Sequence, residues 1–350
     1  MAASSLPDSA LLRHTRRLVT VPLVVVTTAV ATTLLPILLP LCWIVSLWPG
    51  TRGALRSGAF VLAYLWCETI GIAVSAWLWV RHGAPTRRSG ARWQKFIDAN
   101  FALQCWWANA LKAAATALFE LHFSVEGADA LDGAPAIMLP RHASIADTVI
   151  PIVFYAMPRR IRLRYVQKRE LLFDPCLDIV GNRLPNCFVA RTGVDALDDV
   201  ERITLLARDA PSREGFLIYP EGTRFSARRR LRILERLASR VDAADLARMQ
   251  AWTDLLPPRP GGTLALIAAA PHHDLLFCAH TGFEGASHFS TLINGSWTGA
   301  EVHIRFWRIL RHEVPADASE QREFLFAQWD RMQRSVVEMR HQVAPGPTAP

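Results

Sequence analysis

Residues 134–147 read APAIMLPRHASIAD, and this stretch decides how the chain around it folds. The apolar run 134–140 has the length and composition of a buried strand, so His142 is expected where that strand gives way to a loop. Asp147 follows five positions later. In a straight helix, residues five apart are rotated by roughly 140° and do not face each other. A His142–Asp147 pair therefore requires a bend after His142, with Asp147 on the helix that follows.

A second stretch, residues 215–224, reads GFLIYPEGTR and repeats the pattern of a strand followed by a turn. The turn carries one acid, Glu221, and one permanent cation, Arg224. A histidine oriented by a carboxylate can take a proton from a hydroxyl group, which makes His142 and Asp147 candidate catalytic residues. By itself the pair is equally compatible with hydrolysis, with metal binding or with a buried hydrogen bond that has no catalytic role.

Apolar runs bounded by turn residues predict an α/β fold for the chain beyond residue 95. Helices are expected between the strands, notably at 195–208, and an amphipathic helix at 317–341 is expected to begin at a cap formed by Asp317 and Glu320. The apolar stripe of that last helix is expected to pack into the core. The predicted strands are 122–126, 135–139, 161–167, 186–190, 215–219, 275–280 and 301–307.

The N-terminal part of the chain predicts a membrane-embedded helical hairpin at 18–80, preceded by a basic segment at 1–17. Residues 18–48 are 31 positions without a charge, and a membrane-spanning helix needs only about 20. Residues 57–80 form a second candidate span, interrupted by Glu68, and an acid at such a depth is usually paired or functional.

Basic residues flank the hairpin on both outer sides. The link between the two candidate spans carries only Arg52 and Arg56. This asymmetry predicts that both ends of the hairpin, and with them the catalytic domain, face the cytoplasm at the cell (inner or plasma) membrane. The flanking residues are Arg13, Arg16 and Arg17 before the hairpin, and Arg81, Arg87, Arg88, Arg92 and Lys95 after it.

Together the His-x4-Asp and Glu-Gly-Thr-Arg motifs resemble those of the glycerolipid acyltransferase family, of the lysophosphatidate acyltransferase type, over residues 95–310. Residues 188–191 (FVAR), residues 168–172 (KRELL) and the apolar run 275–278 after Pro271 resemble further blocks of the family. Three positions depart from the family pattern: Arg141, where the family often has Asn, Tyr219, where it often has Phe, and Ala190, where it often has an acid.

The resemblance implies a mixed sheet flanked by helices, with His142 as the general base and Asp147 as its partner. It implies that the turn residues Glu221, Gly222 and Thr223 shape the acceptor site. The residues expected to hold the acceptor's phosphate are Arg224, Arg191 and Lys168. Arginine grips phosphate through two parallel hydrogen bonds and lysine acts as a point charge, so these side chains also suit phosphate on chemical grounds.

The function that follows is transfer of a fatty acyl group from acyl-CoA or acyl-carrier protein to the free hydroxyl of a lysophospholipid. The expected acceptor is 1-acyl-sn-glycerol-3-phosphate, which would give phosphatidic acid, with no cofactor beyond the thioester co-substrate. Two alternatives remain: an acyltransferase for another headgroup (lysophosphatidylglycerol-like, lysophosphatidylinositol-like or a glycolipid), and a non-catalytic lipid-binding scaffold. Ser144 suggests a serine nucleophile, but the Gly-x-Ser-x-Gly elbow is missing.

A net charge of +8 is concentrated in two arginine clusters, at 159–164 and at 224–240. Beside a membrane anchor, such clusters favour anionic membrane lipids as partners over nucleic acid, although a solvated helix face explains the later cluster as well. The long stretch 226–256 departs from compact bacterial relatives, which leaves the acceptor headgroup open. The six cysteines show no paired spacing, and His272-His273-Asp274 alone does not predict a metal site. An acyltransferase domain is expected at 95–343 and a disordered tail at 344–350.

Overall fold

A seven-stranded mixed sheet organises the protein, in a computed structural model that describes residues 10–83, 85, 89–189, 196–208, 210–284 and 289–342. The strand order is β1-β7-β6-β2-β5-β3-β4. β6 and β7 are antiparallel and all other neighbouring pairs are parallel, so β1 and β7 run against the other five strands. The strands are β1 (His122–Glu126), β2 (Ala136–Pro140), β3 (Arg162–Lys168), β4 (Cys187–Val189), β5 (Glu214–Leu217), β6 (Asp274–Thr281) and β7 (Glu301–Ile309).

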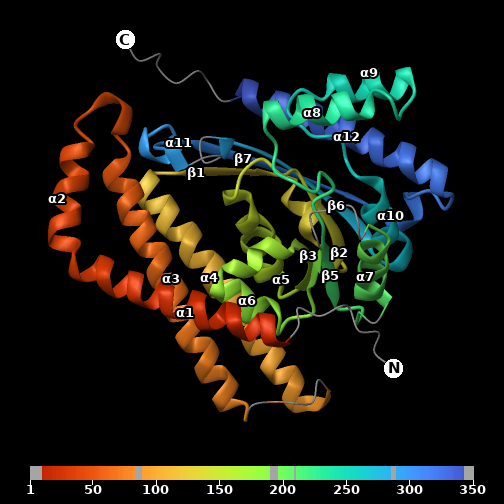
Figure 1. The fold of residues 1–350 in the computed structure, drawn as a ribbon. Coiled ribbons are helices and arrows are strands. Elements are labelled where there is room, and N and C mark those ends of the chain that lie inside the picture. Colours follow the sequence, from red (N-terminus) through yellow and green to blue (C-terminus); the bar gives the residue numbers. More distant parts are fainter. Residues whose placement is uncertain are drawn as a thin grey trace.

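The α/β prediction is confirmed, and each predicted strand bound lies within two residues of the observed one. Helices cover both faces of the sheet (Figure 1). The predicted tail at 344–350, together with Arg191, lies outside the described residues. The α-helices beyond the N-terminal region are α4 (Gly90–Phe119), α5 (Met157–Arg159), α6 (Pro175–Gly181), α7 (Ala196–Arg208), α8 (Ala227–Leu237), α9 (Ala243–Ala251), α10 (Pro260–Ala269), α11 (Phe289–Ile293) and α12 (Ala318–Gln342).

Alternation along the central strand β2 divides the interior into two cores. Ile137 and Leu139 face a core built with α7, α10 and α12, whereas Ala136 and Met138 face a core built with α4. All four residues are fully buried, as expected for a parallel strand covered by helices on both faces. The apolar stripe of α12 packs in the first core, and the Asp317 carboxylate caps this helix by accepting the backbone N–H groups of Ser319 and Glu320.

The first predicted membrane span is not a single helix. It folds as α1 (Ala10–Thr33) and α2 (Leu35–Val45), followed by α3 (Ala54–Arg81). The break falls where Pro36 lacks the N–H that would continue α1 by bonding to the Thr32 carbonyl, and its ring would crowd that carbonyl. Figure 1 shows α1 running crosswise below and α2 rising beside α3.

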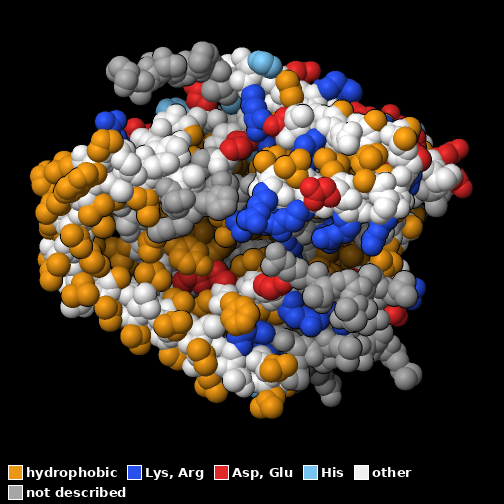
Figure 2. Space-filling model, turned by 45° about the horizontal axis from the view of Figure 1, so that its top comes forward, with side chains coloured by type: hydrophobic (Ala, Val, Ile, Leu, Met, Phe, Trp, Pro, Cys, Tyr) orange, Lys and Arg blue, Asp and Glu red, His pale blue; other side chains and the backbone are white. Residues whose placement is uncertain are grey.

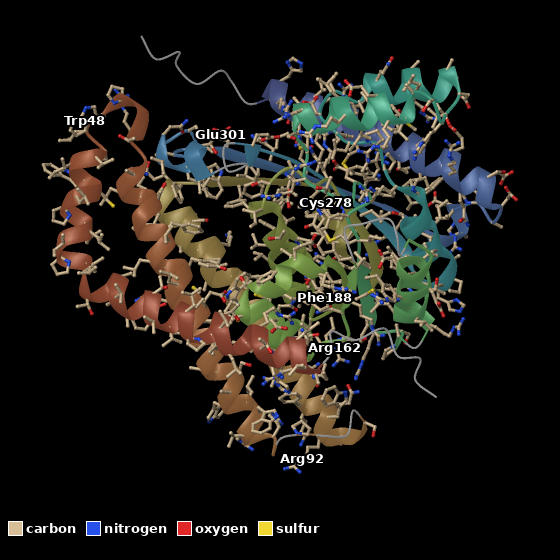
Figure 3. The ribbon with its side chains drawn as sticks, viewed as in Figure 1. Trp48, Arg92, Arg162, Phe188, Cys278 and Glu301 are labelled. Atoms are coloured by element: carbon tan, nitrogen blue, oxygen red, sulfur yellow. The ribbon has the colours of Figure 1, made fainter. Side chains whose placement is uncertain are left out.

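Membrane association is favoured by the surface of these three helices. Ala10–Thr33 and Pro49–Arg81 are each long and apolar enough to cross a membrane by length and composition. Most exposed large apolar side chains of the described chain lie between Leu11 and Val80. In Figure 2 hydrophobic side chains crowd the left margin, and Figure 3 places Trp48 at the outer end of the α2–α3 turn, far from Cys278 in the sheet.

Polar contacts fix the apolar helices to the rest of the protein. Glu68, midway along α3, is buried and accepts hydrogen bonds from Trp107 Nε1 at 2.8 Å and from the Cys176 backbone N–H at 3.2 Å. At the start of α1, Arg16 and Arg17 both form ion pairs with the buried Asp178 of α6, at 2.7 and 2.9 Å. Two arginines that the sequence assigned to the membrane flank therefore attach α1 to the catalytic part of the chain.

Replacing Asp178 with alanine should loosen α1 without unfolding the sheet. Both arginines would lose their carboxylate in a largely desolvated setting, which should weaken the docking of α1 by about 2 kcal/mol. Hydrogen exchange measured by mass spectrometry should then become faster across α1 and stay unchanged in β2 and β6. Asp98→Ala, which removes the partner of Arg162 at an exposed position, is the control; equal exchange of α1 in both variants would contradict this role of Asp178.

Candidate active site

His142 and Asp147 meet at the corner after β2. The chain turns at residues 141–145 and enters a 3-10 helix, η3 (Ala146–Val149), which carries Asp147. His142 Nδ1 lies 3.0 Å from Asp147 Oδ1. The bend that the spacing requires is therefore present, and it brings the two side chains into hydrogen-bond contact.

Asp147 is held rigidly as an acceptor. Its Oδ2 accepts the backbone N–H groups of Ala143 and Ser144 at 2.7 and 2.8 Å, and His280 Nε2 lies 3.5 Å away. Burial alone would raise the pKa of Asp147, but His142, His280 and the Ser144 N–H outweigh it and lower the pKa below its ordinary value. The carboxylate therefore accepts a hydrogen bond from His142 Nδ1–H, which leaves Nε2 as the basic nitrogen.

The second motif holds the main chain of His142 from the other side. The Glu221 carboxylate accepts the His142 N–H at 2.8 Å, and the His142 carbonyl accepts the Phe225 N–H at 2.7 Å. The Tyr219 ring packs against the imidazole with centroids 4.3 Å apart. Because backbone and ring are both fixed, the direction in which Nε2 points is set by the fold. No protein group bonds to Nε2 within the described part of the chain.

Glu221 joins three chain segments. Its second oxygen accepts the Leu256 N–H at 3.0 Å, and the side chain is almost completely buried. Burial raises the pKa of Glu221 to about 8, although the two N–H groups and Arg141 act in the opposite direction. Both carboxyl oxygens face backbone amides, so Glu221 shapes the site by fixing the His142 loop and the segment around Leu256.

A pair of arginines lies around Gly222 at the mouth of the site. Gly222 has a φ of +64°, and an added Cβ would lie 3.0 Å from Arg259 Cδ. Arg259 is fixed beside the motif because its N–H donates to the Pro220 carbonyl at 2.8 Å. Arg224 and Arg259 are exposed and Thr223 is half-buried. Neither guanidinium has an ion-pair partner among the residues whose placement is described.

Arg259 was missed by reasoning from the sequence. It stands in the stretch 257–262, PPRPGG, which resembles the branches of the family that act on lysophospholipids with larger headgroups and gave no role to this arginine. The available signal was the pair of prolines before it, because they restrict where the following side chain can lie.

Lys168 and Arg191 are the other two predicted phosphate ligands. Lys168 ends β3, at the same sheet edge as His142 but two strands away, or about 10 Å. Arg191 follows β4 in the part of the chain that the structure does not describe. The sheet therefore brings Lys168 to the correct edge, and the position of Arg191 stays a prediction.

Arg141 is a structural cation. Its side chain is fully buried, and its guanidinium donates to the His280 carbonyl, to Glu284 at 2.8 Å and to the Asp254 carbonyl at 3.1 Å. Burial alone would raise the pKa of Glu284, but Arg141 outweighs it and lowers that pKa to about 2. The sequence identified Arg141 only as a departure from the family motif, and it holds three segments together behind the catalytic corner.

The arrangement gives less support to a serine nucleophile at Ser144 and to a metal site at His272–Asp274. Ser144 is fully buried, and its Oγ accepts the Ala146 N–H at 3.2 Å. His273 Nε2 lies 2.9 Å from the Glu214 carbonyl, and Asp274 pairs with Arg308. Within the described ranges no group of three His, Cys, Asp or Glu side chains could hold a metal ion.

Comparison with known proteins agrees with this geometry. Residues 122–261, which include both motifs and Arg259, match the family model described as Acyltransferase. The match supports a glycerolipid acyltransferase family for this part of the chain. Its fold is similar to the crystal structure of the 1-acyl-sn-glycerophosphate (LPA) acyltransferase PlsC from Thermotoga maritima, with a TM-score of 0.51 and 14% identity over 81% of this chain and 97% of that one. No curated protein matches the chain.

Replacing Gly222 with alanine should disturb the acceptor site beyond its effect on stability. A left-handed backbone costs alanine about 1–2 kcal/mol, and the new methyl group would also displace Arg259. Gly299→Ala is a matched control, because Gly299 has a φ of +71° and nothing lies within 4 Å of its added Cβ. Both variants should lower the melting temperature to a similar extent, and Gly222→Ala alone should raise the KM for the acceptor. An equal acceptor KM in the two variants would show that the Arg259 contact is unimportant.

Proposed function

We propose that the protein is a membrane-associated O-acyltransferase. It moves a fatty acyl group from a thioester, acyl-CoA or acyl-carrier protein, to the free hydroxyl of 1-acyl-sn-glycerol-3-phosphate and yields phosphatidic acid. The observation that carries the proposal is a histidine oriented by a buried carboxylate, beside two exposed arginines at the same sheet edge. Among the described residues, His142 Nε2 has no hydrogen-bond partner and neither arginine has an ion-pair partner. The printed name of the similar PlsC structure supports this acceptor.

The proposed reaction is a direct transfer. His142 Nε2 takes the proton of the acceptor hydroxyl while the hydroxyl oxygen attacks the thioester carbonyl. The C–S bond then breaks, and the imidazolium returns the proton to the departing thiolate. Asp147 stabilises the imidazolium through Nδ1–H and keeps the ring oriented. The buried position of Ser144 favours this route over an acyl-serine intermediate.

Arg224 and Arg259 are the proposed ligands of the acceptor's phosphate. Lys168, farther along the same edge, is a further predicted ligand, and Arg191 stays a prediction from the sequence. Guanidinium groups stay charged and bind phosphate oxygens in pairs. The apolar surfaces of α1, α2 and α3 supply the membrane attachment from which a lipid acceptor enters. The basic flanks favour a cytoplasmic orientation at the inner or plasma membrane, and beside the apolar helices they favour anionic lipids over nucleic acid as a surface partner.

A second acceptor class is favoured by one specific observation. The segment between the Glu-Gly-Thr-Arg turn and Arg259 folds into two helices, α8 and α9, so the acceptor site has additional basic surface beside it. A lysophospholipid with a larger anionic headgroup, such as lysophosphatidylglycerol or lysophosphatidylinositol, would contact this surface.

The purified full-length protein in detergent should acylate lysophosphatidate with acyl-CoA or acyl-carrier protein as donor. His142→Ala should lower kcat by about 10²–10⁴-fold, because it removes the general base, and Asp147→Asn should have an effect of similar size. Radiolabelled donor and thin-layer chromatography would measure the product. Circular dichroism and vesicle flotation would check that the variants remain folded and membrane-bound.

A panel of acceptors separates the alternatives. Turnover of lysophosphatidylglycerol or lysophosphatidylinositol without turnover of lysophosphatidate would show that the proposed acceptor is wrong and that the proposed reaction type is correct. Absence of turnover on every lysolipid with both donors, together with specific lipid binding, would favour the non-catalytic scaffold. Near-normal turnover by folded His142→Ala would rule out the proposed mechanism.

Arg224→Ala and Arg259→Ala should each raise the KM for lysophosphatidate by about 10-fold, the expected loss for one hydrogen bond to a charged group. The KM for monoacylglycerol, which lacks the phosphate, should change little. Arg213→Ala is the control, because Arg213 is exposed at the opposite end of β5. A similar rise in KM for both acceptors would show that these arginines do not recognise the phosphate.

A further inference from the structure

Four arginines that have no carboxylate partner among the described residues extend from the turn after β5 along α8. They recur at every fourth position and are all exposed: Arg224, Arg228, Arg232 and Arg236. Arg228, Arg232 and Arg236 lie on one face of α8, because residues four apart share a helix face. Arg224 precedes the helix. Leu231, which is 57% exposed, lies on the same side of the helix. Glu235 is the one carboxylate within α8.

Two neighbouring arginines of α8, Arg229 and Arg230, have a structural role, because they bond to backbone carbonyls. The Arg229 guanidinium donates to the Arg224 carbonyl, and Arg230 donates to the carbonyls of Trp252 and Gln250. These contacts hold α8 against the turn that precedes it and against the end of α9. The exposed row makes no such contact in the described structure, and like charges four apart on a helix destabilise it by about 0.2–0.5 kcal/mol per pair. An anionic partner would compensate for that repulsion.

The position of α8 disfavours the membrane as this partner. Figure 1 shows α1, α2 and α3 at the left and lower margin, whereas α8 and α9 lie with α12 at the upper right. The exposed apolar side chains that would enter a bilayer are concentrated between Leu11 and Val80. α8 is therefore separated from the apolar surface, and its partner is expected to arrive from water.

We propose that the row Arg224–Arg228–Arg232–Arg236 is the docking surface for an acidic acyl-carrier protein, which presents the acyl thioester on a phosphopantetheine arm. The inference rests on the proposed function and names its donor. A row of charges along a whole helix, with an exposed leucine among them, fits a protein surface better than the compact phosphates of a nucleotide.

The length of α8 agrees with docking of an acyl-carrier protein. The Phe225 N–H bonds to the His142 carbonyl, so α8 begins directly beside the catalytic histidine. From Ser226 to Arg236 the chain rises by about 15 Å at 1.5 Å per residue. The arm between thioester sulfur and phosphate has a length comparable to roughly four residues of extended chain, also about 15 Å. A carrier docked toward the far end of α8 would thus reach His142 with its thioester.

The test compares two donors in the same full-length protein. Charge reversal in Arg232→Glu/Arg236→Glu should raise the KM for acyl-carrier protein by about 10-fold or more, because rim charges steer association, and the KM for acyl-CoA should change less than about 2-fold. The control is Arg208→Glu/Arg213→Glu, which alters net charge equally at two exposed arginines near the far end of β5. Thermal unfolding checks that each variant folds.

Binding of fluorescently labelled holo-carrier protein, measured by anisotropy in detergent, gives a readout that needs no turnover. Weaker binding by Arg232→Glu/Arg236→Glu and normal binding by the control would support the docking surface even if the proposed reaction failed. An equal rise in the KM for acyl-carrier protein and for acyl-CoA would overturn the proposed docking surface in favour of a nucleotide or phosphate site. Unchanged carrier binding with reduced flotation on phosphatidylglycerol vesicles would overturn it in favour of a lipid surface.

Discussion

The Glu221 carboxyl group is the contact on which the catalytic corner depends. It accepts the N–H of His142, 79 positions earlier in the chain, and the N–H of Leu256, 35 positions later. Three segments that follow different elements are thereby fixed to one side chain. Each amide would otherwise be a buried donor without a partner, which costs about 1–3 kcal/mol. The family resemblance assigns Glu221 to the acceptor site, but its contacts show that it first keeps His142 in place.

Burial separates the arginines of this basic chain into two kinds. Arg16 and Arg17 meet the buried carboxylate of Asp178, and the buried Arg141 guanidinium meets Glu284 and two backbone carbonyls, because a desolvated guanidinium is stable only when its donors are satisfied. Arg224 and Arg259 remain exposed at the mouth of the site. The buried arginines hold segments of the chain together, and the exposed arginines are available to an anionic ligand. Net charge alone does not distinguish them, since it counts both kinds equally.

The sequence predicted the sheet well because buried strands leave a local signal. The seven apolar runs and the His142–Asp147 bend follow from periodicity, from helix geometry and from the turn residues that end each run. What the sequence did not reveal depends on contacts between distant residues. The Asp178 ion pairs with α1, the buried position of Arg141 and the approach of Arg259 to Gly222 all join segments far apart in the chain. The break between α1 and α2 was foreshadowed by the sequence, because Pro22, Pro36 and Pro40 could each kink the first span, and the break falls at Pro36.

The arrangement of surfaces explains why one sheet edge suits a reaction between two very different substrates. A lipid acceptor partitions into the bilayer, so it must approach from the side of α1, α2 and α3, where apolar side chains are exposed. A thioester donor carries phosphate and is soluble, so it must approach through water, past a surface that attracts anions. Parallel strands β2, β5 and β3 end at the same edge, and the corner after β2 lies between the apolar helices and α8. To act on both proposed substrates, His142 needs an Nε2 that points in a fixed direction. Asp147 and Glu221, which are buried on either side of His142, fix that direction.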